Sequence, residues 1–268
     1  MSIARNGVRL AHEEAGAGDP ACILVHGWGT DRTSLARQHE LLSATHRVIS
    51  VDLRGFGESS SPPQRYTVDR FADDVAYVAT KLGLERFVVI GHCLGGLVAL
   101  ELAASHAERV LGLVVLESFV VPPAQTVVAL RGTRESLGQE SDDEPAARLL
   151  THLLGTSIDP AERARMLGVL EACPRHVLVA AFEGMLAYDS RAAAAQARCP
   201  FLYVGTSHRC ADEDELRRQC PQVVIERLAG RGHYFPIEAA SELHPLLTRF
   251  LADILEQRQR GHQPVDQH

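Results

Sequence analysis

The sequence predicts an α/β fold with a mostly parallel central sheet, flanked by helices and carrying a helical cap insertion. Short runs rich in Val, Ile and Leu recur along the 268 residues, at 21–27, 47–55, 86–92, 110–118, 199–206 and 222–230. Such runs are typical of parallel strands that are buried on both faces. Between them, residues 68–83 and 97–108 place apolar residues at spacings of three and four, as amphipathic helices do. This alternation predicts a parallel sheet with right-handed crossovers.

The alternation stops after residue 121. Residues 122–180 contain helical patterns separated by polar, Pro and Gly residues, and no convincing strand. We interpret 122–180 as a helical cap between two parts of one core, 1–121 and 181–260, with a disordered tail at 261–268. The alternative is that these helices are ordinary crossovers. Several apolar side chains either line a pocket or only hold the cap together: Phe119, Leu149, Leu150, Leu153, Leu154, Met166, Leu167 and Leu170.

Composition excludes several classes of partner. The net charge is −7 and no long basic run occurs, so we expect binding neither to nucleic acid nor to an anionic membrane surface. No apolar stretch is long enough for a transmembrane helix or a signal peptide, and the six cysteines are scattered. These features favour a cytoplasmic protein with reduced thiols. No metal ligands converge and no phosphate-binding loop occurs, so we expect no metal and no cofactor. The expected partner is a small-molecule substrate, and homodimer formation is left open.

The stretch VIGHCLGG, residues 89–96, carries the strongest chemical signal. A predicted strand runs into Gly-x-Cys-x-Gly and then into a helix, which is the pattern of a nucleophile elbow with Cys93 at its tip. The glycines allow strand and helix to approach closely, and the N-terminus of the helix favours a thiolate at Cys93. Two other interpretations remain. Cys93 is a small buried apolar residue, or it replaces a serine in an engineered protein.

Four segments together resemble the α/β-hydrolase fold superfamily over nearly the whole chain: LVHGWG, VDLRGFGES, VIGHCLGG and GRGHYFPIEAASEL. The resemblance implies that His233 is the general base. It also implies that the backbone N–H groups of Trp28 and Leu94 form the oxyanion hole, and that His26 and His92 have positioning roles. These motifs are specific for the fold and weak for the reaction, because one fold hosts many chemistries.

The acid of the expected triad is ambiguous. Most members of the superfamily carry an Asp after the late strand, where this sequence has His208. Glu117, at the end of an earlier predicted strand, is one replacement, since peptide-synthetase thioesterases and cofactor-free dioxygenases place their acid there. Asp212 or Asp214, in a longer loop, is the alternative. We favour Glu117, because a carboxylate that ends a buried strand is otherwise an expensive buried charge. The predicted triad is Cys93–His233–Glu117.

Three classes of function follow from these residues. The first is acyl transfer through Cys93, as in a thioesterase, esterase or lactonase, or in an acyltransferase or cyclase with an acyl-cysteine intermediate. Dienelactone hydrolases and polyhydroxyalkanoate synthases resemble this chain in having an elbow cysteine. The second is cofactor-independent chemistry with His233 as a base on a heteroaromatic substrate, as a dioxygenase, lyase or isomerase. The third is a non-catalytic binder. The expected substrate is therefore an acyl thioester or an aromatic compound.

The second class rests on a likeness to the cofactor-independent dioxygenases of quinolone breakdown. The shared features are the HGW segment at 26–28, an acid at Glu117, and Phe-Pro at 235–236 shortly after His233. Those enzymes carry a serine and then a histidine at the elbow, where this sequence has Cys93 and Leu94.

Overall fold

The computed structural model describes residues 1–139, 144–154, 157–208 and 210–261. Most of the expected disordered tail, residues 262–268, lies outside these residues. The described strands form one eight-stranded sheet in the order β1-β2-β4-β3-β5-β6-β7-β8. Their bounds are Ser2–Arg5 (β1), Val8–Ala15 (β2), Ala21–Val25 (β3), Val48–Val51 (β4), Phe87–His92 (β5), Val110–Leu116 (β6), Phe201–Gly205 (β7) and Val223–Arg227 (β8).

The sheet is mostly parallel, as the sequence predicts. β4, β3, β5, β6, β7 and β8 run parallel, and each corresponds to one predicted apolar run. β1 and β2 add an antiparallel edge that the sequence pattern does not reveal. The reason is physical: β1 is half exposed and β2 carries polar residues, so neither forms a continuous apolar run.

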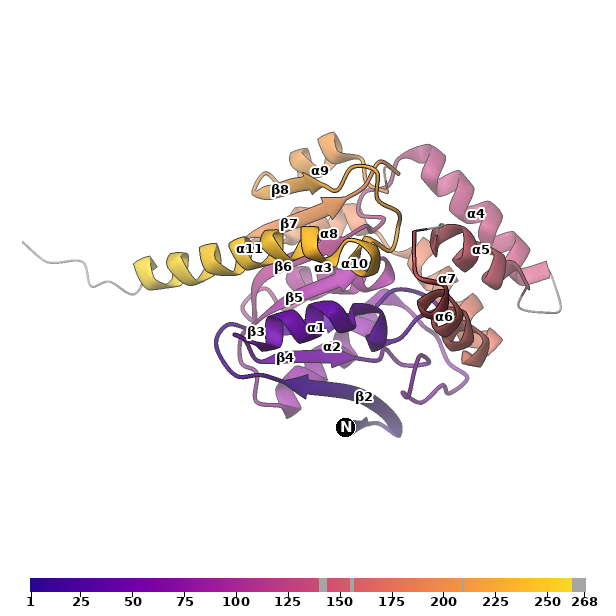
Figure 1. The fold of residues 1–268 in the computed structure, drawn as a ribbon, viewed down its shortest axis with the longest axis horizontal. Coiled ribbons are helices and arrows are strands. Elements are labelled where there is room, and N and C mark those ends of the chain that lie inside the picture. Colours follow the sequence, from indigo (N-terminus) through magenta and orange to yellow (C-terminus); the bar gives the residue numbers. More distant parts are fainter. Residues whose placement is uncertain (140–143, 155–156, 209, 262–268) are drawn as a thin grey trace, which may run out of the picture.

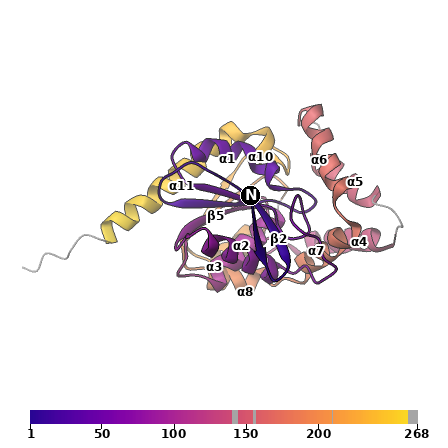
Figure 2. The same ribbon diagram turned by 90° about the horizontal axis from the view of Figure 1, so that it is seen from below.

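Helices cover both faces of the sheet (Figures 1 and 2). The helices of one face are α1 (Ala36–Ser43), α10 (Phe235–Glu238) and α11 (Ala240–Gly261); those of the other are α2 (Val68–Lys81), α3 (Leu94–Ser105) and α8 (Ser190–Gln196). α9 (Glu213–Gln219) packs beside β8. A short 3₁₀ helix, η1 (Arg32–Leu35), directly precedes α1. The sheet is therefore the middle of three layers.

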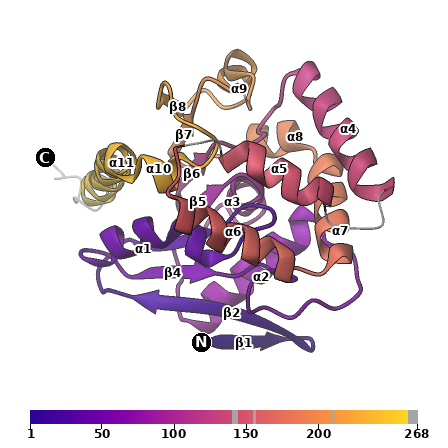
Figure 3. The same ribbon diagram turned by 45° about the vertical axis from the view of Figure 1, so that its right-hand side comes forward.

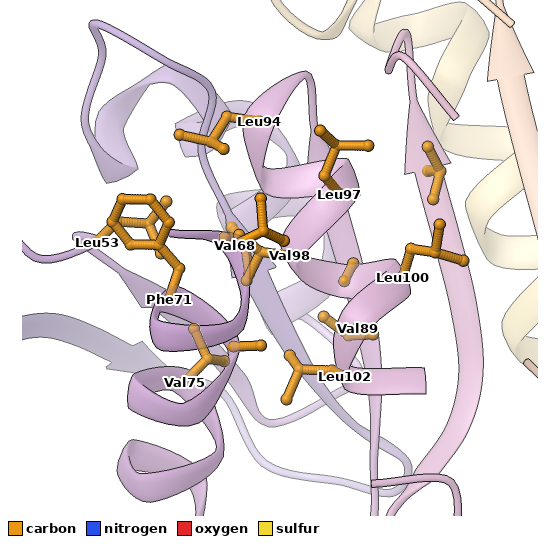
Figure 4. Close-up of a cluster of buried hydrophobic side chains, with 14 of the residues drawn as sticks. Leu53, Val68, Phe71, Val75, Val89, Leu94, Leu97, Val98, Leu100 and Leu102 are labelled. Carbon is orange, nitrogen blue, oxygen red and sulfur yellow. The ribbon is translucent and has the colours of Figure 1, made fainter. Parts of the chain in front are cut away.

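The central helix α3 is buried on nearly all sides. It packs on β5 and β6 and is flanked by α2 and α8, so apolar residues surround its axis. Figure 4 shows the cluster that results, in which Phe71 and Val75 from α2 face Val98 and Leu102 from α3. A helix that is apolar all round is stable only in such an interior position. This burial holds the N-terminus of α3 against the ends of the central strands.

A group of helices gathers at the carboxyl ends of the parallel strands (Figures 1 and 3). These are α4 (Ala124–Gln139), α5 (Glu144–Leu154), α6 (Pro160–Ala172) and α7 (Arg175–Ala187). They fall in the region where the sequence predicts a cap, but α7 runs past residue 180 and α8 packs against α3. The domain boundaries at 121 and 180 therefore stay a prediction. Among the described helices, none is both long enough and apolar enough to cross a membrane.

Candidate active site

Cys93 lies at the turn between β5 and α3 in a strained backbone conformation, with φ +53° and ψ −116°. A residue with a side chain adopts this conformation only where its surroundings enforce it. Three hydrogen bonds do so: the Cys93 N–H donates to the Leu116 carbonyl (3.0 Å), and its carbonyl accepts from the Gly96 N–H (3.0 Å) and from the Ser118 hydroxyl (2.6 Å). The turn thus presents the Cys93 side chain at the edge of the sheet.

Two backbone amides lie beside the Cys93 sulfur and affect its pKa. Burial raises the pKa of the Cys93 thiol to about 11, although hydrogen bonds from the N–H groups of Trp28 and Leu94 lower it. The thiol is therefore protonated near pH 7, and a nucleophilic role needs a base. These are the two N–H groups that the sequence predicts as an oxyanion hole, and that role stays a prediction.

Alkylation of Cys93 by iodoacetamide is expected to be slow at pH 7. Because only the thiolate reacts, the rate is expected to rise about tenfold per pH unit at least up to pH about 10. The measurement is peptide mass spectrometry at Cys93 over a pH series, with glutathione as the control thiol and circular dichroism to verify folding. A rate that levels off below pH about 8 contradicts this, because it indicates a preformed thiolate.

The loop that carries Trp28 is anchored on both sides. The His26 ring accepts a hydrogen bond at Nε2 from the Leu53 N–H (3.0 Å), so its Nδ1–H donates to the Gly27 carbonyl (2.8 Å). The Trp28 indole N–H donates to the Leu178 carbonyl (2.9 Å) in α7, and its ring packs edge-on against Phe182. These contacts hold the Trp28 amide in place and tie the core to the helices above it.

His233 lies in the loop after β8 and is buried. Its carbonyl accepts a hydrogen bond from His92 Nε2 (2.9 Å), and the two rings lie 4.9 Å apart. His92 directly precedes Cys93, so this contact brings the His233 loop to the elbow. Burial, and then the neighbouring His92 and His208, hold the pKa of His233 well below its usual value. The ring is therefore neutral near pH 7, and its Nε2 has no hydrogen-bond partner among the described residues.

Glu117 directly follows β6 and is fully buried, with φ +42°. Its Oε1 accepts hydrogen bonds from the Thr206 hydroxyl (2.9 Å) and the Cys210 thiol (3.1 Å). Its Oε2 is buried and has no partner in the described part of the chain. Burial raises the pKa of the Glu117 carboxyl. Donor atoms of Glu117, Cys210 and His233 all lie within 4.8 Å of one another, so the carboxylate and the imidazole are neighbours.

The other candidate acid lies elsewhere. Asp212 is exposed and caps α9, where its carboxylate accepts a hydrogen bond from the Glu215 N–H (3.0 Å). Asp214 is also exposed and pairs with Arg217 at 3.3 Å. The residue in the usual acid slot, His208, lies 3.0 Å through its Nδ1 from the Thr206 hydroxyl. Because that hydroxyl donates to Glu117, His208 is the donor in this contact.

Thr206, Cys210 and Ser118 are polar neighbours of the site that sequence reasoning missed. Of these three, only Thr206 could have been found from the sequence, because it ends a predicted strand and strand ends gather at one edge of the sheet. The registers of β5 with β6 and of β6 with β7 place His92 beside Leu116 and Leu116 beside Val204. The carboxyl ends of these strands therefore deliver their next residues to one place.

A pocket of about 490 Å³ opens beside Cys93, between the sheet edge and α4, α5 and α7. Its described lining has no Asp, Glu, Lys or Arg: Trp28, Cys93, Phe119, Gln125, Thr126, Ala129, Leu130, Thr133, Leu149, His152, Leu153, Phe182, Met185, His208 and Tyr234. Of the apolar residues singled out in the sequence, Phe119, Leu149 and Leu153 line it. Others pack in the main hydrophobic cluster instead: Leu150, Leu154, Met166 and Leu170.

Three features of this site define the α/β-hydrolase class. They are a strained residue between a central strand and a buried helix, a histidine after the last strand, and helices that cover this edge of the sheet. The family model of the alpha/beta hydrolase fold matches residues 20–159. The chain belongs to this family.

Curated relatives carry several different names. The chain is 27% identical, over 243 residues, to the dihydrolipoyllysine-residue acetyltransferase component of the acetoin cleaving system of Pseudomonas putida, covering 89% of this chain and 65% of that protein. It is 35% identical over 120 residues to bifunctional epoxide hydrolase 2 of Rattus norvegicus, covering 44% of this chain and 22% of the relative. The chain thus spans less than two thirds of the length of these relatives.

Solved structures of other proteins share the fold over almost the whole chain. A thermophilic esterase from Thermogutta terrifontis is 28% identical with a TM-score of 0.81, covering 94% of this chain and 97% of that one. The enol-lactonase from Burkholderia xenovorans LB400 is 23% identical with a TM-score of 0.84, covering 94% and 100%. The second likeness concerns the fold alone.

Proposed function

We propose that this protein is an acyl-transfer hydrolase that acts on ester or thioester bonds, with Cys93 as its nucleophile. The observation that carries the proposal is the strained Cys93, whose thiol pKa is lowered by two backbone N–H groups and which lines a pocket without Asp, Glu, Lys or Arg among its described residues. The similarity to an esterase at 28% identity supports a carbonyl substrate. So does the name of the Pseudomonas putida relative, which is an acetyltransferase component.

The first half of the reaction forms an acyl-cysteine. The sulfur of Cys93 attacks the carbonyl carbon of the bound substrate while His233 takes the thiol proton. The N–H groups of Trp28 and Leu94 hold the negative oxygen of the tetrahedral intermediate. When this intermediate collapses, His233 passes the proton to the departing thiol or alcohol.

In the second half, His233 removes a proton from water, and the resulting hydroxide attacks the acyl carbon. The thiol of Cys93 then leaves with a proton from His233, and a carboxylic acid is released. An acceptor other than water gives a transferase by the same steps. Glu117 holds one tautomer of His233 and stabilises the imidazolium formed in both halves.

The pocket supports substrates with an uncharged, largely apolar acyl group. Aromatic and aliphatic side chains dominate its lining, among them Phe119, Leu130, Leu153 and Phe182, and no carboxylate or ammonium faces it in the described residues. A volume of about 490 Å³ suits a small or medium-sized molecule. The cytoplasmic location and the homodimer considered from the sequence stay predictions.

An acyl-enzyme at Cys93 is the expected intermediate. The protein is mixed with p-nitrophenyl butyrate or S-butyryl-N-acetylcysteamine, quenched in acid within seconds, and digested for mass spectrometry. We expect a butyryl group on the peptide that contains Cys93, and none on that peptide in Cys93→Ala. Cys199 is half-buried and reports adventitious acylation. Steady turnover without a Cys93 adduct, or with an adduct only at Cys199, contradicts the proposal.

A second function is favoured by one observation. His233 Nε2 has no partner, and aromatic side chains of Trp28, Phe119, Phe182 and Tyr234 line the pocket. His233 could therefore take a proton from the ring hydroxyl of a heteroaromatic substrate, with no bond to Cys93. In that case Cys93→Ala retains turnover of such a substrate while His233→Ala loses it.

A further inference from the structure

Three side chains from separate segments meet close to Cys93 and its pocket. Glu117 follows β6, Cys210 follows β7 and His233 follows β8, and all three are buried. One carboxylate oxygen, one sulfur and one ring nitrogen lie within 4.8 Å of one another. This is a mixed O, S, N donor set, which suits zinc and similar divalent ions.

Two atoms of these residues have no hydrogen-bond partner within the described ranges. Glu117 Oε2 and His233 Nε2 are buried and lack hydrogen-bond partners among the described residues. An orphaned buried polar atom costs about 1–3 kcal/mol, so either a contact between His233 and Glu117 or a bound ion would stabilise this cluster. The Cys210 thiol is not part of the triad, and it is this third buried donor that makes the cluster a candidate metal site.

We propose that Glu117, Cys210 and His233 form an inhibitory binding site for Zn²⁺. Binding replaces the proton of the Cys210 thiol with the metal and releases that proton to solvent. The carboxylate and the thiolate together cancel the charge of the ion, so no net charge is buried. Water takes the fourth position, as in zinc sites with three protein ligands.

Only small movements are needed. Tetrahedral zinc with bonds of about 2.0–2.3 Å holds its ligand atoms about 3.3–3.6 Å apart. The Cys210 sulfur already lies 3.1 Å from Glu117 Oε1, and the nitrogen of His233 lies within 4.8 Å of both. Side-chain rotations of about an ångström close the site. The pocket lies close to the cluster, because His208 and Tyr234 line it and contact Thr206 and His233.

The binding half of this inference is independent of catalysis, whereas the inhibition rests on the proposed function. A bound ion occupies the lone pair of His233 and the carboxylate of Glu117, so neither is available to move or stabilise the proton of Cys93. Zn²⁺ is therefore expected to abolish turnover, and a chelator to restore it.

Cobalt provides the binding test. Metal-stripped full-length protein is titrated with Co²⁺, and the thiolate-to-cobalt charge-transfer absorption is followed. We expect the band in wild type, in Cys93→Ala and in the matched control Cys220→Ser, which changes another buried cysteine. Cys210→Ser is expected to lose the band and to bind at least tenfold more weakly. A band that survives in Cys210→Ser, or disappears in Cys93→Ala or Cys220→Ser, overturns the site.

A second measurement needs no variant. Zn²⁺ binding to wild type in weak buffer is expected to release about one proton per ion near pH 7, and about two if Glu117 is protonated. Binding without proton release overturns the proposal, because it excludes the Cys210 thiol as a ligand.

Inhibition is compared with each variant's own uninhibited rate. We expect Cys210→Ser to need at least tenfold more Zn²⁺ than wild type or Cys220→Ser for half-inhibition. Equal sensitivity of Cys210→Ser and wild type, or an increase of turnover with Zn²⁺, overturns the inhibitory role. If no ester or thioester is turned over at all, the proposed function fails, and the cobalt and proton measurements still decide whether the site binds metal.

Discussion

Replacement of Cys93 by alanine is expected to lower kcat for a thioester or activated ester by at least about 10³-fold, with a near wild-type melting temperature. Removal of a nucleophile leaves only the catalysis that the oxyanion hole and substrate binding supply. The fold tolerates the change because alanine keeps the Cβ, and the bonds that enforce φ +53° involve the backbone of residue 93. The measurement is steady-state kinetics beside thermal unfolding. Turnover of an ester by Cys93→Ala within about tenfold of wild type contradicts covalent catalysis.

Cys93→Ser is the matched variant, because it keeps the shape of the site and changes one atom. An alcohol is a weaker acid than a thiol and depends more on His233 and its acid. Glu117→Gln is therefore expected to lower kcat by a larger factor, about tenfold or more, in the Cys93→Ser background than in wild type. The same ratio in both backgrounds contradicts the role of Glu117 as the acid that supports His233.

Gly95→Ala is expected to destabilise the protein by more than about 3 kcal/mol, or to prevent folding. A Cβ at Gly95 would lie 2.1 Å from the carbonyl oxygen of Val25 and 2.5 Å from that of His26. Both obstacles are backbone atoms at the end of β3, so no side-chain rotation relieves the clash. Overpacking costs about 1–3 kcal/mol even where side chains can adjust. Urea unfolding measures the difference.

The same close approach supports the chemistry. Because Gly95 lets α3 lie against the end of β3, the amide of Leu94 and the amide of Trp28 can face one sulfur. The control is Gly132→Ala in α4, where an added Cβ meets nothing within 4 Å. There alanine is expected to be neutral or to stabilise by up to about 1 kcal/mol. A Gly95→Ala protein within about 1 kcal/mol of wild type contradicts this account of the elbow.

Local patterns account for much of the fold. The parallel strands are continuous apolar runs, and α2 and α3 have the 3.6-residue period, so the sequence predicts them directly. β1 and β2 are not predicted, because they lie at the edge of the sheet and their burial there leaves no local sequence pattern. The turn at Cys93 is also local, since its glycines and flanking elements are contiguous.

The acid that partners His233 could not be chosen from local patterns. The sequence offers Glu117 and Asp212 as candidates, but it does not show which carboxylate lies near His233. The register of β6 with β7 brings Thr206 to Glu117 across 89 residues, and the loop beyond brings Cys210 to it across 93. Asp212, two residues beyond Cys210, instead caps α9 in solvent. Such placements depend on strand pairing and loop path rather than on residue type.

The sequence by itself determined the alternation of strands and helices, the strained turn at Cys93 and the class of fold, because each follows from spacing within a few residues. Only the tertiary structure shows the rest of the site. It places the amides of Trp28 and Leu94 beside the Cys93 sulfur and makes Glu117, Cys210 and His233 neighbours. It also forms the pocket under α4, α5 and α7, whose described lining has no Asp, Glu, Lys or Arg. The physical reason is that a site at the carboxyl edge of a parallel sheet is assembled from strand ends that only sheet pairing brings together.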